Sequence, residues 1–308
     1  MTMKIGIYGG NVRRGAPLTS IIDEVVEMEE RGFSSYWFPQ VGTYDALTVI
    51  ALIGQKTSRI EMGTAVVPSY PRHPSALAQQ AATVNTLTNG RLVLGVGPSH
   101  KPGIEDGLGL KYDRPALHMR EYVSIIKSLG TEGKVDFDGE MYRIKTGFAV
   151  PEAQPFQVVI SALAPLMLKA AGEVADGTVT WMVGLNTIKN NTSPAIRKAA
   201  SDAGRSDPRI VVGLPVCVHD DKDQATARAV QIFKGYGMLP NYRRQLDAEG
   251  IEEAGEIAVV GNEKEVEEQL QGFYDAGATE VIASVIPAGD DSRGSFKRSY
   301  ELLESLAK

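Results

Sequence analysis

Short apolar runs alternate with longer amphipathic stretches along almost the whole chain. The run KIGIY at residues 4–8 is continuous and is followed by glycine, as is typical of a buried parallel strand. In residues 19–31 apolar side chains instead recur on a helical period. Strands are predicted in this way at residues 4–8, 35–38, 60–67, 92–96, 158–161, 178–182, 210–218 and 280–284. Helices are predicted between them, at residues 19–31, 46–56, 74–87, 120–129, 165–175, 193–203 and 263–276.

This alternation predicts the fold class. Strands that alternate with helices pair in parallel through right-handed crossovers, and eight strands favour a closed barrel over an open sheet. We therefore expect an α/β fold, a (β/α)8 TIM barrel with insertions at the C-terminal face, as one domain over residues 1–308. Residues 102–150 contain a predicted hairpin at 136–143 and are expected to cap that face. Residues 233–256 form a second insertion, either another lid or a packing surface.

Composition narrows the class of protein. A chain of 308 residues suits such a barrel, and 43% hydrophobic with 23% charged residues is ordinary for a globular protein. The net charge of −6 argues against nucleic acids and anionic membranes as partners, because phosphate affinity needs clustered Lys and Arg. No signal peptide and no apolar run of about 20 residues is evident, so a cytoplasmic protein is expected. The single cysteine, Cys217, excludes an intrachain disulfide and is interpreted as a small core residue.

Candidate chemistry is sought at the carboxyl ends of the strands, where barrels of this kind place their active sites. Those ends carry mostly small and apolar residues with few titratable groups. The sequence has no HExxH or Cys-rich spacing, no GxSxG elbow and no paired carboxylates at these positions, so no metal site is expected. The remaining pattern suits a large, flat, apolar ring, which indicates a bound cofactor that carries the chemistry.

A phosphate site is predicted at one strand-to-helix junction. Ser161, Ala162, Leu163, Ala164 and Pro165 join a predicted strand to the helix at 165–175. Backbone amides at a helix N-terminus bind anions, and here they would point into the barrel mouth. An ordinary βα turn is the alternative.

Long segments resemble one enzyme superfamily. GTAVVPSYPRHPSALAQQAATVNTLTNGRLVLGVG (63–97), ISALAPLMLKAAGEVADGTVTWMVG (160–184), and the stretches 204–218 and 275–287 are similar to luciferase-like flavin and deazaflavin oxidoreductases. ALAPLML and DGTVTWMVG look most like an actinobacterial subgroup that depends on the deazaflavin coenzyme F420. The resemblance implies F420 as cofactor, with FMN as the alternative.

The resemblance also implies positions for the cofactor. Relatives have a non-prolyl cis peptide at the end of the third strand, which supports the middle ring of the cofactor and would here join Ala65 to Val66. The ribityl-phosphate would lie near the junction at 161–165. The strand-end residues Val67, Gly97, Thr180 and Trp181 are expected to line the same pocket, although Trp181 could instead pack in the core.

Two strand ends bear on the reaction. Gln40, which is expected to contact the cofactor and to act in catalysis, stands where several deazaflavin-dependent dehydrogenases have a histidine. Glutamine forms hydrogen bonds but does not exchange protons near neutral pH, which favours reduction of a substrate double bond over alcohol oxidation. His100 occupies a position that is acidic in sugar-phosphate-oxidising relatives and is the expected proton donor, with a hydrogen-bonded loop histidine as the alternative. His73 is expected to cap the helix at 74–87 or to bond a loop carbonyl, with a catalytic role as the alternative.

These expectations give a hypothesis and two rivals. The resemblance implies an F420-dependent oxidoreductase that transfers hydride between F420 and a small-molecule substrate, in the reductive direction. An FMN-dependent luciferase-like monooxygenase is the rival enzyme, and a non-catalytic cofactor-binding barrel is the rival of another class. Luciferase-like barrels are commonly dimeric, so a homodimer is expected.

Overall fold

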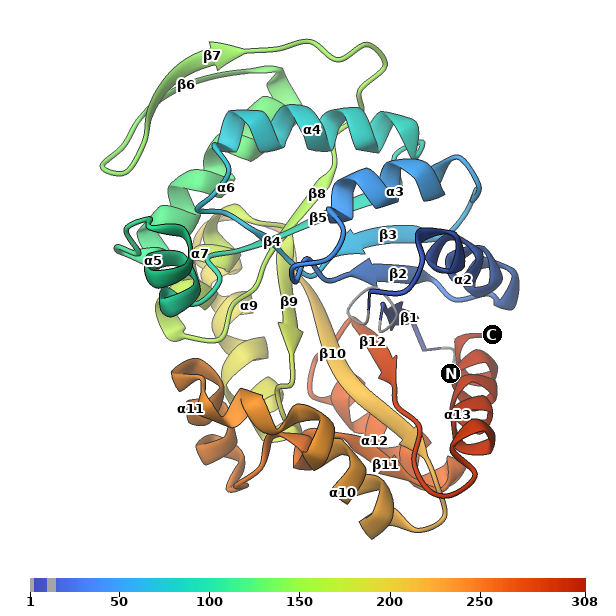
Figure 1. The fold of residues 1–308 in the computed structure, drawn as a ribbon. Coiled ribbons are helices and arrows are strands. Elements are labelled where there is room, and N and C mark those ends of the chain that lie inside the picture. The colour runs from blue at the N-terminus through green and yellow to red at the C-terminus, as the bar shows by residue number, and fades with distance from the viewer. Residues whose placement is uncertain (1–2, 10–14) are drawn as a thin grey trace.

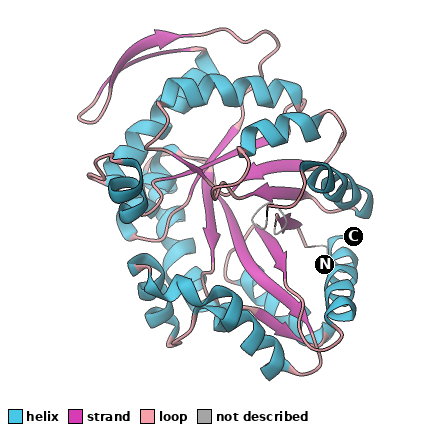
Figure 2. Ribbon diagram, viewed as in Figure 1, coloured by secondary structure: helices cyan, strands magenta, loops and turns pink. Residues whose placement is uncertain are grey.

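Eight parallel strands close into a barrel in the computed structural model, which describes residues 3–9 and 15–308 (Figures 1 and 2). Each strand pairs with the next, and the last pairs with the first, so the sheet has no gap. The predicted TIM barrel is confirmed. Its strands are β1 (Ile5–Tyr8), β2 (Ser35–Phe38), β3 (Glu61–Thr64), β5 (Leu92–Gly97), β8 (Gln157–Ile160), β9 (Gly177–Trp181), β10 (Arg209–Val218) and β12 (Glu280–Val285).

A layer of helices surrounds the strands (Figure 2). Their apolar faces and the outward side chains of the strands form one large core. A helix cannot bury its apolar stripe alone, so packing against the barrel stabilises both layers. The helices of this layer are α2 (Leu18–Arg31), α3 (Ala46–Gly54), α4 (Pro74–Leu87), α6 (Pro115–Glu132), α7 (Pro165–Val174), α9 (Ser193–Asp202), α12 (Glu263–Asp275) and α13 (Ser292–Ala307).

The stretch at 102–150 reaches the carboxyl end of the barrel with its first part alone, although the whole of it was expected to cap that end (Figure 1). Its first part is a helix, α5 (Lys101–Leu108), and α6 is an ordinary barrel helix between α4 and α7. The predicted hairpin is present as β6 (Lys134–Asp138) and β7 (Arg143–Gly147), paired antiparallel. It lies along the outer side of α6 rather than over the barrel (Figure 1).

The second irregular stretch is largely helical. It contains the end of α10 (Lys222–Phe233), a 3-10 turn at Lys234–Met238, α11 (Pro240–Glu249) and a second 3-10 turn at Ala254–Ile257. A short strand, β11 (Val259–Gly261), then pairs with the last residues of β10. β10 is long enough to pair with β9 at its start and with β11 at its end.

Strand alternation divides the barrel side chains into two sets. One set points inward, and the described members of that inner cluster are Tyr8, Trp37, Val93, Val159, Val179, Val211 and Ile282, with Ala65, Val66 and Trp181 packed against it. The other set points outward to the helices. Cys217 is fully buried in the outer set, as expected, and burial raises the pKa of its thiol to about 11.

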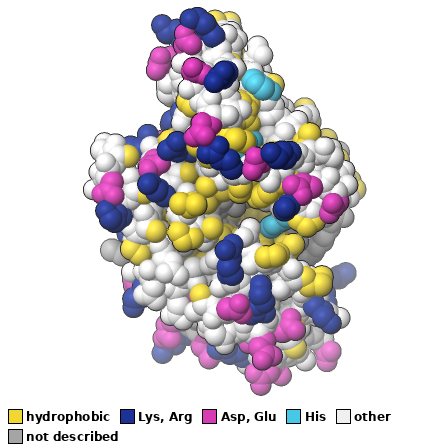
Figure 3. Space-filling model, turned by 90° about the vertical axis from the view of Figure 1, so that its left-hand side faces the viewer, with side chains coloured by type: hydrophobic (Ala, Val, Ile, Leu, Met, Phe, Trp, Pro, Cys, Tyr) yellow, Lys and Arg dark blue, Asp and Glu magenta, His cyan; other side chains and the backbone are white. Residues whose placement is uncertain are grey.

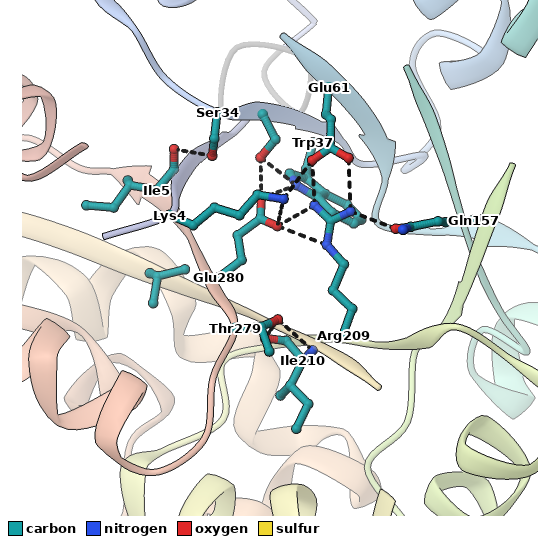
Figure 4. A network of polar contacts seen from close by, with 12 residues as sticks. Lys4, Ile5, Ser34, Trp37, Glu61, Gln157, Arg209, Ile210, Thr279 and Glu280 are labelled. Carbon is teal, nitrogen blue, oxygen red and sulfur yellow. Dashed lines mark hydrogen bonds and ion pairs between the residues drawn. The ribbon is translucent and has the colours of Figure 1, made fainter. Parts of the chain in front are cut away.

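An ion network closes the amino end of the barrel (Figure 4). Arg209 bonds to Glu61 at 2.9 Å through Nη2, and its Nε lies 3.1 Å from the fully buried carboxylate of Glu280. Glu280 also accepts from Ser35, and Lys4 Nζ lies 2.8 Å from Glu61. Beside them Arg209 lies over the ring of Trp37 at 5.6 Å. The barrel therefore opens only at its carboxyl end, here called the mouth.

Among residues 3–9 and 15–308, no helix is long and apolar enough to cross a bilayer.

Candidate functional site

The mouth is a hollow with an apolar lining. On the face that carries α5 and α11, hydrophobic side chains gather across a depression, and charged side chains surround it (Figure 3). Such a lining binds apolar rings, and a few polar groups then orient them.

One wall of the mouth is a bulge between β3 and β4 (Val67–Pro68). The peptide joining Ala65 to Val66 is cis, as expected. At this point the Thr64 hydroxyl, and not the backbone of β3, bonds to β5. It donates to the Gly95 carbonyl at 2.7 Å and accepts from the Gly95 amide at 2.9 Å. β4 then resumes pairing with β5 through Val67 and Val96. The bulge is thus fastened to β5 on both sides.

Two aromatic rings support the bulge from inside the barrel. The Tyr8 hydroxyl donates to the Ala65 carbonyl at 3.3 Å. The rings of Tyr8 and Trp181 stack with centroids 4.5 Å apart and planes 13° apart. Trp181 is half-buried and packs against the inner cluster of the barrel, and its contact with a cofactor stays a prediction.

Two glycines in β5 permit the close approach of the bulge. A Cβ at Gly95 would lie 1.8 Å from the Thr64 carbonyl oxygen. A Cβ at Gly97 would lie 2.8 Å from Val66 Cγ2 and 3.2 Å from Ser161 Cβ. Any side chain at Gly97 would therefore displace Val66, which is expected to contact the cofactor ring, and Ser161, which is expected near the phosphate.

The predicted phosphate loop leads into α7 at the same end of the barrel. The amide of Ser161 donates to the Val96 carbonyl at 2.9 Å, and Gln245 of α11 donates to the Leu163 carbonyl at 3.3 Å. Ala164 has extended backbone at the helix N-cap and no side chain that could cap α7. Pro165 opens the helix. The N-terminus of α7 is thus left for a ligand anion or water to satisfy.

Gln40 and His100 both lie at strand ends on the mouth. The side-chain oxygen of Gln40 accepts from the Ala46 amide at 3.4 Å, so its side-chain nitrogen is the group that can donate to a ligand. His100 is half-buried at the N-cap of α5 but makes no capping bond with its side chain. Burial lowers the pKa of His100, so the imidazole is neutral at pH 7.

Three of the expected cofactor-binding residues point their side chains away from the mouth. Thr180 lies between Val179 and Trp181, both of which face inward, and its hydroxyl donates to the Val211 carbonyl at 3.4 Å. Val67 and Ala162 are fully buried in the outer core between strands and helices. A contact of Val67 or Thr180 with a cofactor would therefore go through the backbone, as was expected of the loop that contains Ala162, and cofactor binding by these residues stays a prediction. The sequence located the ends of the strands. The direction of each side chain depends on the alternation of inward and outward positions along its strand.

A second polar cluster lies beside the mouth, between β4 and α6. His118 shares hydrogen bonds with the Ser69 hydroxyl at 2.8 Å and the Tyr142 hydroxyl at 3.2 Å, and its ring stacks on Tyr70.

His73, as predicted, caps α4 by accepting from the Ser75 amide at 3.4 Å. None of the described residues forms a group of three or more side chains able to hold a metal ion.

Sequence reasoning missed a group of aromatic residues beyond Trp181. Phe233, Tyr236 and Tyr242 come from the stretch at 233–256 and reach toward Trp181 and His100. The available signal was three aromatic residues within ten positions of a stretch already interpreted as a lid or packing surface.

Two curated relatives align along nearly the whole chain. The F420-dependent glucose-6-phosphate dehydrogenase of Kineococcus radiotolerans is 28% identical, over 99% of this chain and 97% of that protein. The 5,10-methylenetetrahydromethanopterin reductase of Methanopyrus kandleri is 27% identical, over 91% of this chain and 92% of that protein.

Solved structures show the same fold. The coenzyme F420 dependent tetrahydromethanopterin reductase from Methanopyrus kandleri matches with a TM-score of 0.81 at 23% identity, over 100% of both chains. The oxygenating constituent of 3,6-diketocamphane monooxygenase from Pseudomonas putida, solved with FMN, has a TM-score of 0.73 at 17% identity, over 100% of this chain and 97% of that one. The luciferase-like monooxygenase family profile matches residues 3–280. This chain therefore belongs to the luciferase-like monooxygenase family of enzymes.

Proposed function

We propose that this chain is an F420-dependent oxidoreductase that transfers hydride between the deazaflavin and a small organic substrate, in the reductive direction. Two full-length relatives named for F420 or for a reductase reaction support the class. The observation that carries the proposal is the bulge at Ala65 and Val66, held against β5 and supported by Tyr8 at the floor of an apolar mouth.

The residues present fit such a cofactor. Gly97 lacks a side chain where a Cβ would meet Val66, which lets the bulge that is expected to support the ring lie close against β5. The loop at 161–165 ends at the uncapped N-terminus of α7, which suits a phosphate. Gln40 can donate from its side-chain nitrogen to a ring carbonyl. When bound, a deazaflavin supplies a hydride from a ring carbon and reacts poorly with oxygen.

We assign proton transfer to His100. Its neutral imidazole carries a proton on one ring nitrogen and accepts at the other, so it can relay a proton from water to the substrate. Gln40 has no such capacity, which is why reduction is favoured over oxidation of an alcohol.

A spectral titration tests the proposal. We expect the purified protein to shift the absorbance of F420 on binding and to leave that of FMN unchanged. Uptake of oxygen that depends on FMN would overturn the proposal in favour of a monooxygenase. Binding of F420 without hydride transfer to any of a broad panel of carbonyl, imine and alkene substrates would indicate a non-catalytic barrel. The expected homodimer stays a prediction, to be measured by sedimentation.

A further inference from the structure

β4, the strand that follows the bulge, is only two residues long. Its second residue, Pro68, has no backbone N–H and cannot donate to a neighbouring strand. The next residue, Ser69, completes the attachment, because its amide donates to the Gly97 carbonyl at 2.9 Å. The bulge therefore lies between two points of attachment to β5, the Thr64 hydroxyl before it and Ser69 after it.

The side chain of Ser69 is held in turn by His118 of α6. The Ser69 hydroxyl shares a hydrogen bond of 2.8 Å with Nε2 of the imidazole, and both residues are buried. The imidazole lies parallel to the ring of Tyr70, with centroids 4.0 Å apart, and its Nδ1 shares a hydrogen bond of 3.2 Å with the Tyr142 hydroxyl. These contacts fix the direction in which Nε2 points, and so the place of the Ser69 hydroxyl.

The position of β4 matters because Val66 lies tightly against β5. A Cβ at Gly95 would lie 3.3 Å from Val66 Cγ1, and a Cβ at Gly97 would lie 2.8 Å from Val66 Cγ2. Val66 is half-buried and packs against the inner cluster of the barrel. Interiors packed as closely as this transmit small displacements, so a shift of β4 relative to β5 moves Val66 as well.

We propose that His118 is a positioning residue for the cofactor ring: it holds Ser69, Ser69 fixes β4, and β4 fixes the bulge against which the ring lies. His118 is buried on α6 and acts only through Ser69. This inference rests on the proposed function, which supplies the ring. A pair that merely satisfied two buried polar groups would contribute to stability alone.

Two substitutions of His118 separate these roles. Glutamine is long enough to place its amide near the position of Nε2 and can keep the bond to Ser69, whereas asparagine reaches only the position of Nδ1, toward Tyr142. Both variants lose the ring that stacks on Tyr70, so urea unfolding should show both to be less stable than the wild type. In a spectral titration, F420 affinity should fall about tenfold for His118→Asn, equivalent to about 1.4 kcal/mol, and stay within about twofold of the wild type for His118→Gln.

Substitution of Ser69 tests the same bond from its other side. Ser69→Ala should weaken F420 binding about as much as His118→Asn, and the double variant should bind no more weakly than either single variant, because both act through one bond. The absorbance maximum of bound F420 should also differ from that of the wild type in these variants and not in His118→Gln, because the ring then lies against a displaced bulge.

Leu129→Ala is the control for general destabilisation. Leu129 is buried on the same helix, about three turns from His118, and its truncation leaves a cavity in the outer core. This variant should be less stable than the wild type and yet bind F420 equally well. Equal affinities for His118→Asn and His118→Gln would overturn the proposal, and so would affinities that simply follow stability across all the variants, Leu129→Ala included.

The two proposals can fail separately. If F420 binds and none of the variants changes its affinity, His118 is structural and the cofactor assignment stands. If the wild type binds FMN instead, and the variants weaken FMN binding in the same order, the positioning role stands and the proposed function is wrong. Binding of neither cofactor would overturn both.

Discussion

The imidazole of His118 and the hydroxyl of Ser69 share a hydrogen bond of 2.8 Å in the buried layer between β4 and α6. The hydroxyl of Tyr142, the residue just before β7, shares a hydrogen bond of 3.2 Å with the other ring nitrogen of His118. Ser69 follows β4 and donates its amide to the Gly97 carbonyl at 2.9 Å. One neutral histidine thus connects the outer hairpin to the strand that borders the mouth.

Stability should fall on acidification because of His118. Burial lowers its pKa from the ordinary 6.5 to about 4. Between these values the unfolded chain binds a proton that the native state does not, so stability is complete above about pH 6.5 and declines toward pH 4. The full loss amounts to about 3 kcal/mol. Urea unfolding of the wild type and His118→Gln across this range should show a shallower pH dependence in the variant, whereas His73→Gln, at an exposed site, should follow the wild type. Parallel curves for all three proteins would contradict this role.

Removing the hydroxyl that fastens the bulge should destabilise the fold. Thr64→Val keeps the shape but leaves the Gly95 amide and carbonyl without that partner in a buried place. We expect a loss of about 1–3 kcal/mol in the free energy of unfolding. Thr64→Ser should retain most of the stability. The exposed Thr83→Val on α4 serves as the matched control, and a Thr64→Val protein as stable as that control would refute the assignment.

The ion network at the amino end should matter far more than a surface pair. Arg209→Met removes the nearer of two cations from the buried carboxylate of Glu280 and leaves Lys4, whose Nζ lies 3.5 Å away, so we expect a cost of up to about 3–5 kcal/mol. Arg143→Met breaks an exposed pair with Asp138 of 2.9 Å and should cost less than about 1 kcal/mol. Chemical denaturation measures both values. Cofactor affinity of the folded Arg209→Met protein should be unchanged, because the network lies at the opposite end of the barrel.

A methyl group on Gly97 should weaken cofactor binding. It would lie 2.8 Å from Val66 and 3.2 Å from Ser161, so both must move. We expect F420 affinity to fall about tenfold or more, equivalent to about 1.4 kcal/mol. Gly103→Ala on α5 adds a methyl that meets nothing within 4 Å and should bind as the wild type does. Identical affinities would place the cofactor elsewhere.

The barrel could be predicted because each strand is a short apolar run with a clear end. All eight strands appear within one to two residues of their predicted bounds, except that the run at 60–67 is broken into β3 and β4 by the bulge. Helix α5 was not predicted because its glycines, Gly103 and Gly107, resemble those of a loop. α11 was missed because few of its residues are buried, chiefly Tyr242 and Leu246.

The site was harder to predict than the fold. Strand ends locate the mouth, but a shift of one residue reverses the direction of a side chain, as Thr180 shows beside Trp181. The positions of Phe233, Tyr236 and Tyr242 depend on the path of the chain between β10 and β11, which no local pattern specifies. Arg209 and Glu280 stand at strand starts, where charged residues ordinarily face solvent, so their burial depends on the closure of the barrel.

Because Cys217 is buried, a cysteine introduced on the surface can be labelled selectively. Its thiol is inaccessible and, with a pKa near 11, is almost entirely protonated at neutral pH, so it should not react with maleimides in the native protein. A cysteine introduced at Met238, a residue that is 82% exposed at the end of the turn at Lys234–Met238, would then be the single reactive thiol. A fluorophore attached there could report on ligand entry without removal of the natural cysteine.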